Sequence, residues 1–213
     1  MKNKEVGKIK QLIIIGNGGH SRVVQSIIKQ TNSYQLLEIW DDNYEEEIID
    51  VGIRYKPIPK KNVASADSVC YFIAIGDNLI RSKIANQLQL STADYATIIH
   101  PQAIVDKQAI VKTGSLIMAN AVVQTNSIIG HHSIVNTSAV VEHDTMIGDF
   151  VHVAPNVTLT GNCHLSKHVF IGAGSVLIPN ISIGEHTVIG AGSVVIRSIP
   201  SNVTAYGNPA RIV

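Results

Sequence analysis

A six-residue hydrophobic period runs through the second half of the chain. From residue 103 to residue 198 the sequence divides into sixteen consecutive hexapeptides without an insertion, and the third residue of each is Val, Ile or Leu. The residue two places earlier is usually Ala, Ser or Thr. This period fits neither an amphipathic helix nor a simple alternating strand. It predicts a repeat fold in which three short strands make one triangular coil of eighteen residues.

Sixteen residues form the predicted inward row of this repeat. They are Val105, Val111, Ile117, Val123, Ile129, Val135, Val141, Ile147, Val153, Leu159, Leu165, Ile171, Leu177, Ile183, Ile189 and Val195. A single coil cannot bury its own apolar residues, because neighbouring coils must cover them. The repeat is therefore expected to fold as one cooperative domain.

The first half of the chain alternates between strand-like and helix-like segments. Strands are predicted at 11–15, 36–40, 71–75 and 96–99, and helices at 21–30 and 79–88. This alternation predicts a small Rossmann-like parallel sheet with its ligand crevice at the carboxyl ends of the strands. We therefore predict an α/β domain over residues 1–100 and a repeat domain over residues 101–213.

A glycine-rich turn, residues 16–20, connects the first strand to the first helix. Gly18 and Gly19 would let the backbone approach an anion closely, the helix N-terminus would direct N–H groups toward it, and His20 could add a donor. Ser21 stands where a dinucleotide fingerprint has its third glycine, which disfavours NAD. The alternative is a purely structural tight turn in which His20 acts as a cap.

Two acidic residues, Asp41 and Asp42, end the second predicted strand. An acidic side chain at this place often meets a ribose or a base edge. A solvated strand end is the alternative. Gly76 follows the third strand and falls at the same predicted edge of the sheet.

Composition narrows the possible partners. The formal net charge of the 213-residue chain is +1, without a long run of one sign, so no nucleic-acid or anionic-membrane partner is expected. The apolar run at 12–15 is too short for a signal-peptide core or a membrane span, and a cytoplasmic protein is expected. Cys70 and Cys163 make no metal or redox motif and are predicted to be small buried residues.

Histidines are concentrated in the middle coils. Six of the nine lie there: His131, His132, His143, His152, His164 and His168. A zinc site like that of gamma-class carbonic anhydrases could use histidines from neighbouring coils, but residue 173, where its last ligand would stand, is alanine. Because a catalytic zinc site needs three converging protein ligands, we predict that the protein holds no metal.

His143 is followed directly by Asp144 and takes the fifth place of its hexapeptide, next to a corner. It should therefore project from the coil. An adjacent carboxylate can orient an imidazole and raise its basicity, as a general base near neutral pH requires. An incidental pair on a turn is the alternative.

The repeat resembles the left-handed β-helix of the hexapeptide-repeat acyltransferases. More closely, residues 142–153, together with 16–20, 41–42, 74–76 and 206–210, resemble the bacterial nucleotide-sugar acetyltransferases of the sialic acid, bacillosamine and perosamine type. The resemblance covers nearly the whole chain in the same domain order. The left hand of the helix is implied by this resemblance and not by the spacing.

The resemblance implies a role for each group of residues. The α/β domain would bind the nucleotide sugar, with Gly18, Gly19 and His20 at the phosphates, Asp41 and Asp42 at the nucleoside, and Gly76 beside it. His143 would be the catalytic base, tuned by Asp144 at a place where relatives often have Glu. His152 would contact acetyl-CoA, and Ala173 and Ala191 would contact its pantetheine arm through their backbone. Family members form trimers, so His143 and the thioester site would come from different chains.

Three functions remain open at this stage. The favoured one is an acetyl-CoA-dependent N-acetyltransferase that acts on a nucleotide-linked aminosugar of the UDP-4-amino type by direct attack, without a covalent enzyme intermediate. An O-acetyltransferase of a sialic-acid-like sugar could use the same base on the same fold. A non-catalytic nucleotide-binding β-helix is the third, and an intact His143-Asp144 pair argues against it. The sequence does not specify UDP or GDP, the sugar, or the position acylated.

Overall fold

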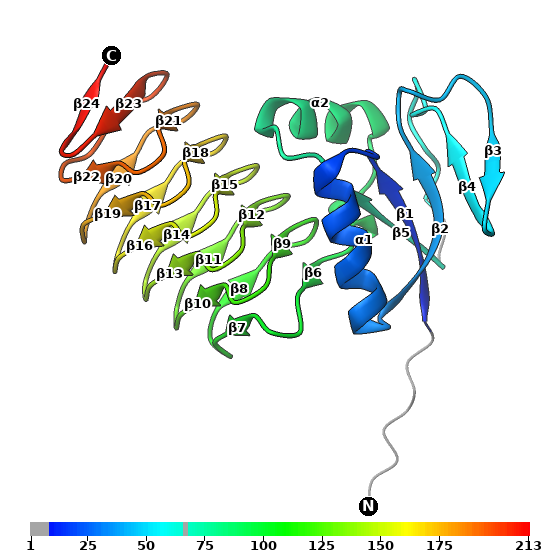
Figure 1. The fold of residues 1–213 in the computed structure, drawn as a ribbon, viewed down its shortest axis with the longest axis horizontal. Coiled ribbons are helices and arrows are strands. Elements are labelled where there is room, and N and C mark those ends of the chain that lie inside the picture. Colours follow the sequence, from blue (N-terminus) through cyan, green and yellow to red (C-terminus); the bar gives the residue numbers. More distant parts are fainter. Residues whose placement is uncertain (1–8, 66–67) are drawn as a thin grey trace, which may run out of the picture.

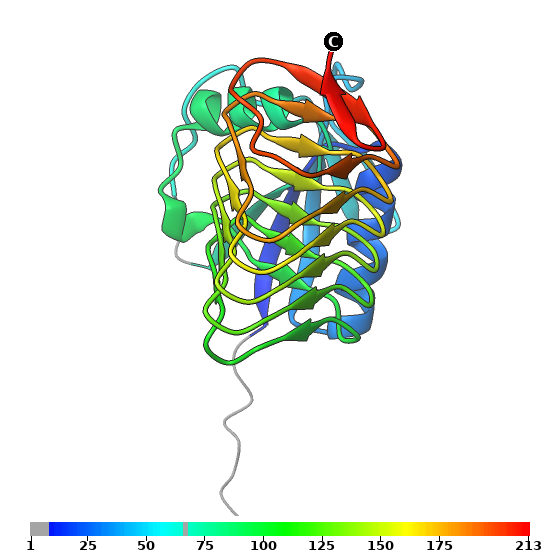
Figure 2. The same cartoon turned by 90° about the vertical axis from the view of Figure 1, so that its left-hand side faces the viewer.

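The computed structural model describes residues 9–65 and 68–213. A small α/β part comes first along the chain, and a long parallel β-helix lies beside it (Figure 1). Figure 2 shows the coils of the β-helix stacked in register. The predicted fold class, an α/β domain followed by a β-helix of hexapeptide repeats, is confirmed. Among the helices of the described residues, none is long and apolar enough to cross a membrane.

The α/β part is built on a five-stranded sheet with the order β3-β4-β2-β1-β5. Its elements are β1 (Lys10–Ile15), α1 (Gly19–Thr31), β2 (Tyr34–Trp40), β3 (Ile48–Asp50), β4 (Ile53–Lys56), β5 (Val69–Ile73), α2 (Asn78–Leu88) and the short 3₁₀ helix η1 (Thr92–Asp94). The strands and helices predicted from the sequence in this half are all present, with ends within two residues of the expected ones.

The hairpin of β3 and β4 was not predicted. It turns at Val51 and Gly52, which both have left-handed backbone angles, with φ of 45° and 79°. A β-branched residue rarely adopts this conformation, so the turn lacks the usual sequence signal. Strands β1, β2, β4 and β5 form the predicted parallel sheet, and β3 adds an antiparallel strand at its edge next to β4.

Each hexapeptide of the repeat forms one two-residue strand. The strands are β7 (Ile104–Val105), β8 (Ile110–Val111), β9 (Leu116–Ile117), β10 (Val122–Val123), β11 (Ile128–Ile129), β12 (Ile134–Val135), β13 (Val140–Val141), β14 (Met146–Ile147), β15 (His152–Val153), β16 (Thr158–Leu159), β17 (His164–Leu165), β18 (Phe170–Ile171), β19 (Val176–Leu177), β20 (Ser182–Ile183), β21 (Val188–Ile189) and β22 (Val194–Val195). β6 (Ile98–Ile99) precedes them, and β23 (Thr204–Gly207) and β24 (Ala210–Ile212) follow.

Strands three apart along the chain pair in parallel, which confirms the eighteen-residue coil. Val123 of β10, for example, pairs with Val141 of β13. The pairing creates three sheets, with the orders β22-β19-β16-β13-β10-β7, β20-β17-β14-β11-β8 and β24-β23-β21-β18-β15-β12-β9-β6. The predicted inward row from Ile117 onward fills the interior between the sheets.

Small residues occupy the inner corners of the coils, where they satisfy buried backbone groups. The Ser115 hydroxyl donates to the Gly130 carbonyl over 2.6 Å. Cys163 takes the equivalent place, with its Sγ 3.5 Å from the Ile178 carbonyl oxygen. Both Cys163 and Cys70 are free and buried, as predicted.

From Gly114 to Gly192, the sixth residue of each hexapeptide turns the corner with a left-handed backbone. The non-glycine residues in this conformation have φ between 54° and 64° and are Asn120, Asn126, His132, Ser138, Asp144, Phe150, Asn156, Asn162, His168, Asn180 and His186. Asn, Asp and His tolerate this region better than most residues do. The recurrence of histidine at 132 and 168 therefore has a backbone cause that is independent of metal binding.

The α/β part packs against the sheet that contains β9, β12 and β15. Leu116 and Ile134 point outward from this sheet and share a buried apolar cluster with Leu12 and Val24. Further along the same sheet, His152 of β15 meets the backbone of Gly76, which follows β5. The packing therefore places the carboxyl end of β5 directly on the outer face of the β-helix.

Candidate active site

His143 and Asp144 form a hydrogen-bonded pair at the corner that follows β13. Nδ1 of His143 lies 2.8 Å from Oδ2 of Asp144, and the His143 side chain is 57% exposed. Donation from Nδ1 to the carboxylate leaves Nε2 as the proton acceptor, a tautomer inferred from the hydrogen-bond partner. The imidazole ring lies against Gly161 of the next coil, where an added Cβ would come within 2.6 Å of Nε2. Only glycine leaves room for this ring position.

Asp144 is held in place by the preceding coil. Its N–H donates to the Thr125 carbonyl over 3.2 Å, and its Oδ1 accepts from Nδ2 of Asn126 over 3.1 Å. The hydrogen bond from His143, and secondarily that from Asn126, lowers the pKa of the Asp144 carboxyl below its ordinary value. The carboxylate is therefore ionised near neutral pH and available to stabilise an imidazolium at position 143.

The glycine turn presents an open surface at the start of α1. Gly18 is the N-cap of α1, and no side chain caps the helix there. A Cβ added at Gly18 would meet nothing within 4 Å, and one at Gly19 would meet only Nη2 of Arg22 at 3.8 Å. The N–H groups of the first turn are thus accessible in the way that anion binding at a helix N-terminus requires.

Asp41 and Asp42 have different surroundings. The Asp41 carboxylate organises the adjacent turns, because Oδ2 accepts from the Asn17 N–H at 2.6 Å and Oδ1 accepts from the Asn43 N–H at 3.0 Å. The Asp42 side chain lines a cavity of about 600 Å³ together with Tyr44 and Lys60. Of the two carboxylates, that of Asp42 faces a space where a ligand can enter.

His152 connects the β-helix to the α/β part. Its Nδ1 lies 3.0 Å from the Gly76 carbonyl oxygen, and its Nε2 lies 3.0 Å from Nδ2 of Asn136. A carbonyl only accepts and an amide nitrogen only donates, so Nδ1 carries the proton and Nε2 is the acceptor. Burial lowers the pKa of His152 to about 4, so the ring is neutral near pH 7.

The His20 ring lies close to that of His152, with centroids 6.3 Å apart. Burial, and secondarily the charge of Arg81, lowers the pKa of His20 to about 4. The glycine turn and β15 therefore meet through two neutral imidazoles. The structure brings Gly18, Gly19, His20, Gly76 and His152 into one region.

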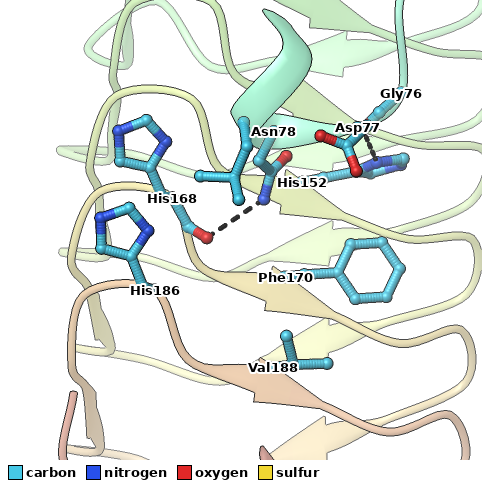
Figure 3. A pocket seen from close by; sticks show the side chains of 9 residues that line it. Gly76, Asp77, Asn78, His152, His168, Phe170, His186 and Val188 are labelled. Carbon is cyan, nitrogen blue, oxygen red and sulfur yellow. Dashed lines mark hydrogen bonds between the residues drawn. The ribbon is translucent and has the colours of Figure 1, made fainter. Parts of the chain in front are cut away.

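A cavity of about 470 Å³ opens beside this region (Figure 3). It lies between the start of α2 and the outer face of β15, β18 and β21, and its lining combines the Gly76 backbone with apolar and imidazole side chains. The lining residues are Gly76, Asp77, Asn78, Leu79, His152, His168, Phe170, His186 and Val188. The cavity can accommodate a group of moderate size next to His152.

Ala173 and Ala191 lie on the corners that follow β18 and β21, one coil apart and exposed. The Gly192 N–H donates to the Ala173 carbonyl over 2.8 Å, which fixes the stacking of the two corners. Within the described part of the chain, the N–H groups of Ala173 and Ala191 have no backbone acceptor. Two amide donors thus follow one another along the edge of the sheet that carries His152.

One chain does not assemble all of these groups. His143 follows β13 in the sheet β22-β19-β16-β13-β10-β7, whereas His152 belongs to β15 in another sheet. The cavity beside His152 is lined without His143 or Asp144. The base and the remaining site residues therefore lie on different faces of the β-helix, and the predicted trimer remains a prediction.

A cluster of possible metal donors includes two residues, His168 and His186, that also line the cavity beside His152. Donor atoms of His168, Glu185 and His186 lie within 4.8 Å of one another. The two rings stack in parallel, with centroids 4.6 Å apart and 4° between their planes, so their lone pairs point side by side and do not converge. Nζ of Lys167 lies 3.4 Å from Glu185 and already neutralises it. Ala173, where the zinc pattern would have its last ligand, lies on a different corner.

Three residues of the site have no role in the prediction from the sequence, although it places the loop of Asn78 at the ligand crevice. Asn136 is the second partner of His152, Asn78 donates to the Val169 carbonyl over 3.0 Å, and Arg81 contacts both parts of the molecule. Asn78 and Arg81 share a helix face at a spacing of three, but an Arg on a helix is usually a solvated residue. Asn78 and Arg81 stand out because they are buried, and the sequence alone does not indicate that burial.

Comparisons with known proteins identify the family. The PglD N-terminal domain matches residues 11–88, and the bacterial transferase hexapeptide (six repeats) matches residues 162–197. The acetyltransferase domain of PglB from Neisseria gonorrhoeae FA1090, in complex with acetyl coenzyme A, is 32% identical with a TM-score of 0.85, and the match covers 97% of this chain and 100% of that one. The chain belongs to the nucleotide-sugar acetyltransferases of the hexapeptide-repeat family.

Two further relatives come from the same family. PerB from Caulobacter crescentus, in complex with CoA and GDP-perosamine, is 31% identical with a TM-score of 0.81, and the match covers 97% of this chain and 98% of that one. The UDP-N-acetylbacillosamine N-acetyltransferase of Bacillus subtilis (strain 168) is 40% identical over 114 residues. That match covers 52% of this chain and 52% of the curated relative, about half the length of each. Family membership confirms the left-handed β-helix that the resemblance implies.

Proposed function

We propose that this protein transfers the acetyl group of acetyl-CoA to the amino group of a nucleotide-linked aminosugar, with His143 as the general base. The observation that carries the proposal is the His143-Asp144 pair on an exposed corner, whose 2.8 Å hydrogen bond leaves Nε2 as the proton acceptor. Complexes of relatives with acetyl coenzyme A, and with CoA and GDP-perosamine, support the two substrates.

The chemistry requires a base on the acceptor side. A sugar amine is largely protonated in water and attacks a thioester only after it loses a proton, which a neutral imidazole accepts. His143 accepts that proton at Nε2, and ionised Asp144 stabilises the resulting imidazolium. The thioester carbonyl becomes an oxyanion in the tetrahedral intermediate and needs a preorganised donor, for which we propose a backbone N–H of a coil.

The α/β part is proposed to bind the nucleotide. The N–H groups of the first turn of α1 bind the phosphates. The space next to Gly18 and Gly19 is open and leaves room for an anion. Asp42 faces a cavity next to Tyr44 and contacts the nucleoside, whereas Asp41 holds the turn in shape. The sugar then extends toward Gly76, where the α/β part meets the β-helix.

The exposed corners of the β-helix are proposed to bind acetyl-CoA. The N–H groups of Ala173 and Ala191, without an acceptor in the described residues, donate to the amide carbonyls of the pantetheine arm. The thioester end reaches His152 and the cavity beside it. Because acetyl-CoA is made and used in the cytoplasm, we propose that the protein acts there, as a homotrimer.

A substrate panel tests the function. UDP- and GDP-linked 4-aminosugars, with the corresponding 4-hydroxy sugars and a sialic acid as comparators, are incubated with acetyl-CoA, and thiol release and product mass are measured. We expect thiol release and a gain of one acetyl group with one of the aminosugars. Turnover of hydroxy sugars alone would favour the O-acetyltransferase. Binding of nucleotide without turnover of any compound would favour the non-catalytic alternative.

A substitution at Gly19 should separate the two binding sites. We expect Gly19→Leu to weaken nucleotide-sugar binding by roughly tenfold or more, because the side chain would fill the space that a phosphate needs above α1. Binding of acetyl-CoA on the β-helix should be nearly unchanged in isothermal titration calorimetry. Lys29→Leu, at the other end of α1, is the matched control. Equal weakening of both ligands would contradict the assignment to separate surfaces.

Replacement of Cys163 should leave turnover close to that of the unchanged protein. Its thiol is buried in an inner corner, where burial raises its pKa above the ordinary value, so it is a poor nucleophile. Serine occupies the equivalent place at Ser115, so Cys163→Ser should also fold normally. Mass spectrometry after incubation with acetyl-CoA alone should detect no acetylated protein. A stable acetylated form that disappears in Cys163→Ser would instead support a covalent intermediate.

A further inference from the structure

Arg81 of α2 is a buried cation without a carboxylate partner among the described residues. The residue is 1% exposed. The guanidinium donates to backbone carbonyls of the α/β part, namely Ile75 over 2.8 Å and Gly76 over 3.1 Å from Nη1. It also donates to the β-helix, from Nε to the His132 carbonyl over 2.7 Å. One side chain therefore ties the loop after β5 to the coil that precedes β12.

The charge of Arg81 persists in this position. Burial lowers its pKa to about 10, which still leaves the guanidinium protonated near neutral pH. Carbonyl dipoles from two parts of the chain surround it, and its planar fork fixes the direction of each donor. A lysine would supply the charge but not the fork, so the shape of the guanidinium matters here as well as its sign.

The Gly76 carbonyl is shared by Arg81 and His152. It accepts from Nη1 of Arg81 over 3.1 Å and from Nδ1 of His152 over 3.0 Å. Asn78 provides a second connection between Arg81 and the β-helix, and its Oδ1 accepts from Nη2 of Arg81 over 2.8 Å. The amide nitrogen of Asn78 donates to the Val169 carbonyl over 3.0 Å, beside β18. The guanidinium thus fixes the Gly76 carbonyl, which together with the Asn136 amide determines which nitrogen of His152 carries the proton.

We propose that Arg81 is a positioning residue that fixes the Gly76 loop on the β-helix and thereby holds His152 as the Nδ1-protonated tautomer at the edge of the active-site cavity. The loop from Gly76 to Asn78 forms one wall of that cavity, and His152 lies next to it, hydrogen-bonded to Gly76 (Figure 3). Without the guanidinium, the Gly76 carbonyl loses a donor and the loop can move away from β15. The kinetic consequence rests on the proposed function, whereas the tautomer does not.

The decisive measurement is the protonation of the two ring nitrogens of His152. In the full-length protein labelled with ¹⁵N-histidine, we expect a protonated Nδ1 and an unprotonated Nε2, assigned by comparison with His152→Gln. In Arg81→Met we expect the two nitrogen shifts to converge, because the acceptor for Nδ1 is no longer held in place. Lys83→Met, which removes an exposed cation from the same helix, should leave both shifts unchanged.

Kinetics provide the second measurement. We expect Arg81→Met to lower kcat/KM for acetyl-CoA by about 10–100-fold, the usual cost of removing a group that orients a functional histidine. Arg81→Lys should fold more readily and retain part of the activity, with an intermediate tautomer signal. An unchanged His152 tautomer in Arg81→Lys and in any folded Arg81→Met would overturn the proposal, as would full activity in either. Absence of turnover in the unchanged protein would count against the proposed function alone, because the tautomer measurement needs no substrate.

Discussion

We expect His143→Ala to lower kcat by about 10²–10⁴-fold, the contribution that a positioned general base typically makes. The acceptor amine would have to lose its proton to water, since the proposed base is gone. The same loss is expected in the single-turnover rate, measured with saturating acetyl-CoA and acceptor so that weaker binding cannot cause it. Near-normal turnover in a correctly assembled variant would exclude His143 as the base.

The fold should survive this substitution. His143 is more than half exposed and contributes no packing to the interior of the β-helix. Its ring lies on Gly161, and removing the ring creates no internal cavity. Circular dichroism and the thermal-unfolding midpoint of His143→Ala should therefore match those of the unchanged protein. His164→Ala, which removes an exposed histidine from the neighbouring coil, is the control for a loss of charge or solubility.

Asp144→Asn tests whether the carboxylate supports the base at His143 or is itself essential. We expect a smaller loss than in His143→Ala, because an amide can still contact Nδ1 but cannot stabilise the imidazolium as a carboxylate does. The left-handed backbone at residue 144, with φ of 59°, is compatible with Asn. Equal losses in the two variants would instead make Asp144 essential in its own right.

The repeat could be predicted almost completely from the sequence. A period of six, with an apolar residue at the third place of every hexapeptide, predicts one short strand per hexapeptide, and the observed strands β7 to β22 follow it without a shift. The projection of His143 was also predictable, because the fifth place of each hexapeptide lies in a turn. These features depend on local spacing, which the sequence displays directly.

The features that escaped prediction depend on contacts between distant segments. The left-handed corners at His132 and His168 make histidine common there, yet the sequence alone invited a comparison with zinc sites. The hairpin of β3 and β4 turns at Val51, although valine rarely adopts the left-handed backbone conformation that it has there. Arg81 contacts the β-helix only because α2 packs on the coil at His132, and no periodicity in the sequence predicts that packing.

Mixing two inactive variants should restore activity, because His143 and His152 lie on different faces of one chain. His143 lies on the corner after β13, and the proposed acetyl-CoA donors at Ala173 and Ala191 follow β18 and β21 of another sheet. One chain alone therefore does not bring the proposed base to the proposed acetyl-CoA site. In the proposed homotrimer, three identical chains around one axis would close such heterologous contacts, and each cleft would take its base from one chain and its coenzyme site from the next.

The two parents are His143→Ala, which lacks the base, and Ala173→Trp, whose side chain blocks the pantetheine path from an exposed corner. Each alone should have little activity. After joint unfolding and refolding in equal amounts, about a quarter of the clefts in random trimers should combine both intact halves, and activity should rise toward that fraction. Native mass spectrometry verifies that mixed trimers have formed, and mixing without refolding is the control. Verified mixed trimers that stay inactive, or a fully active monomer in light scattering, would contradict a cleft shared between chains.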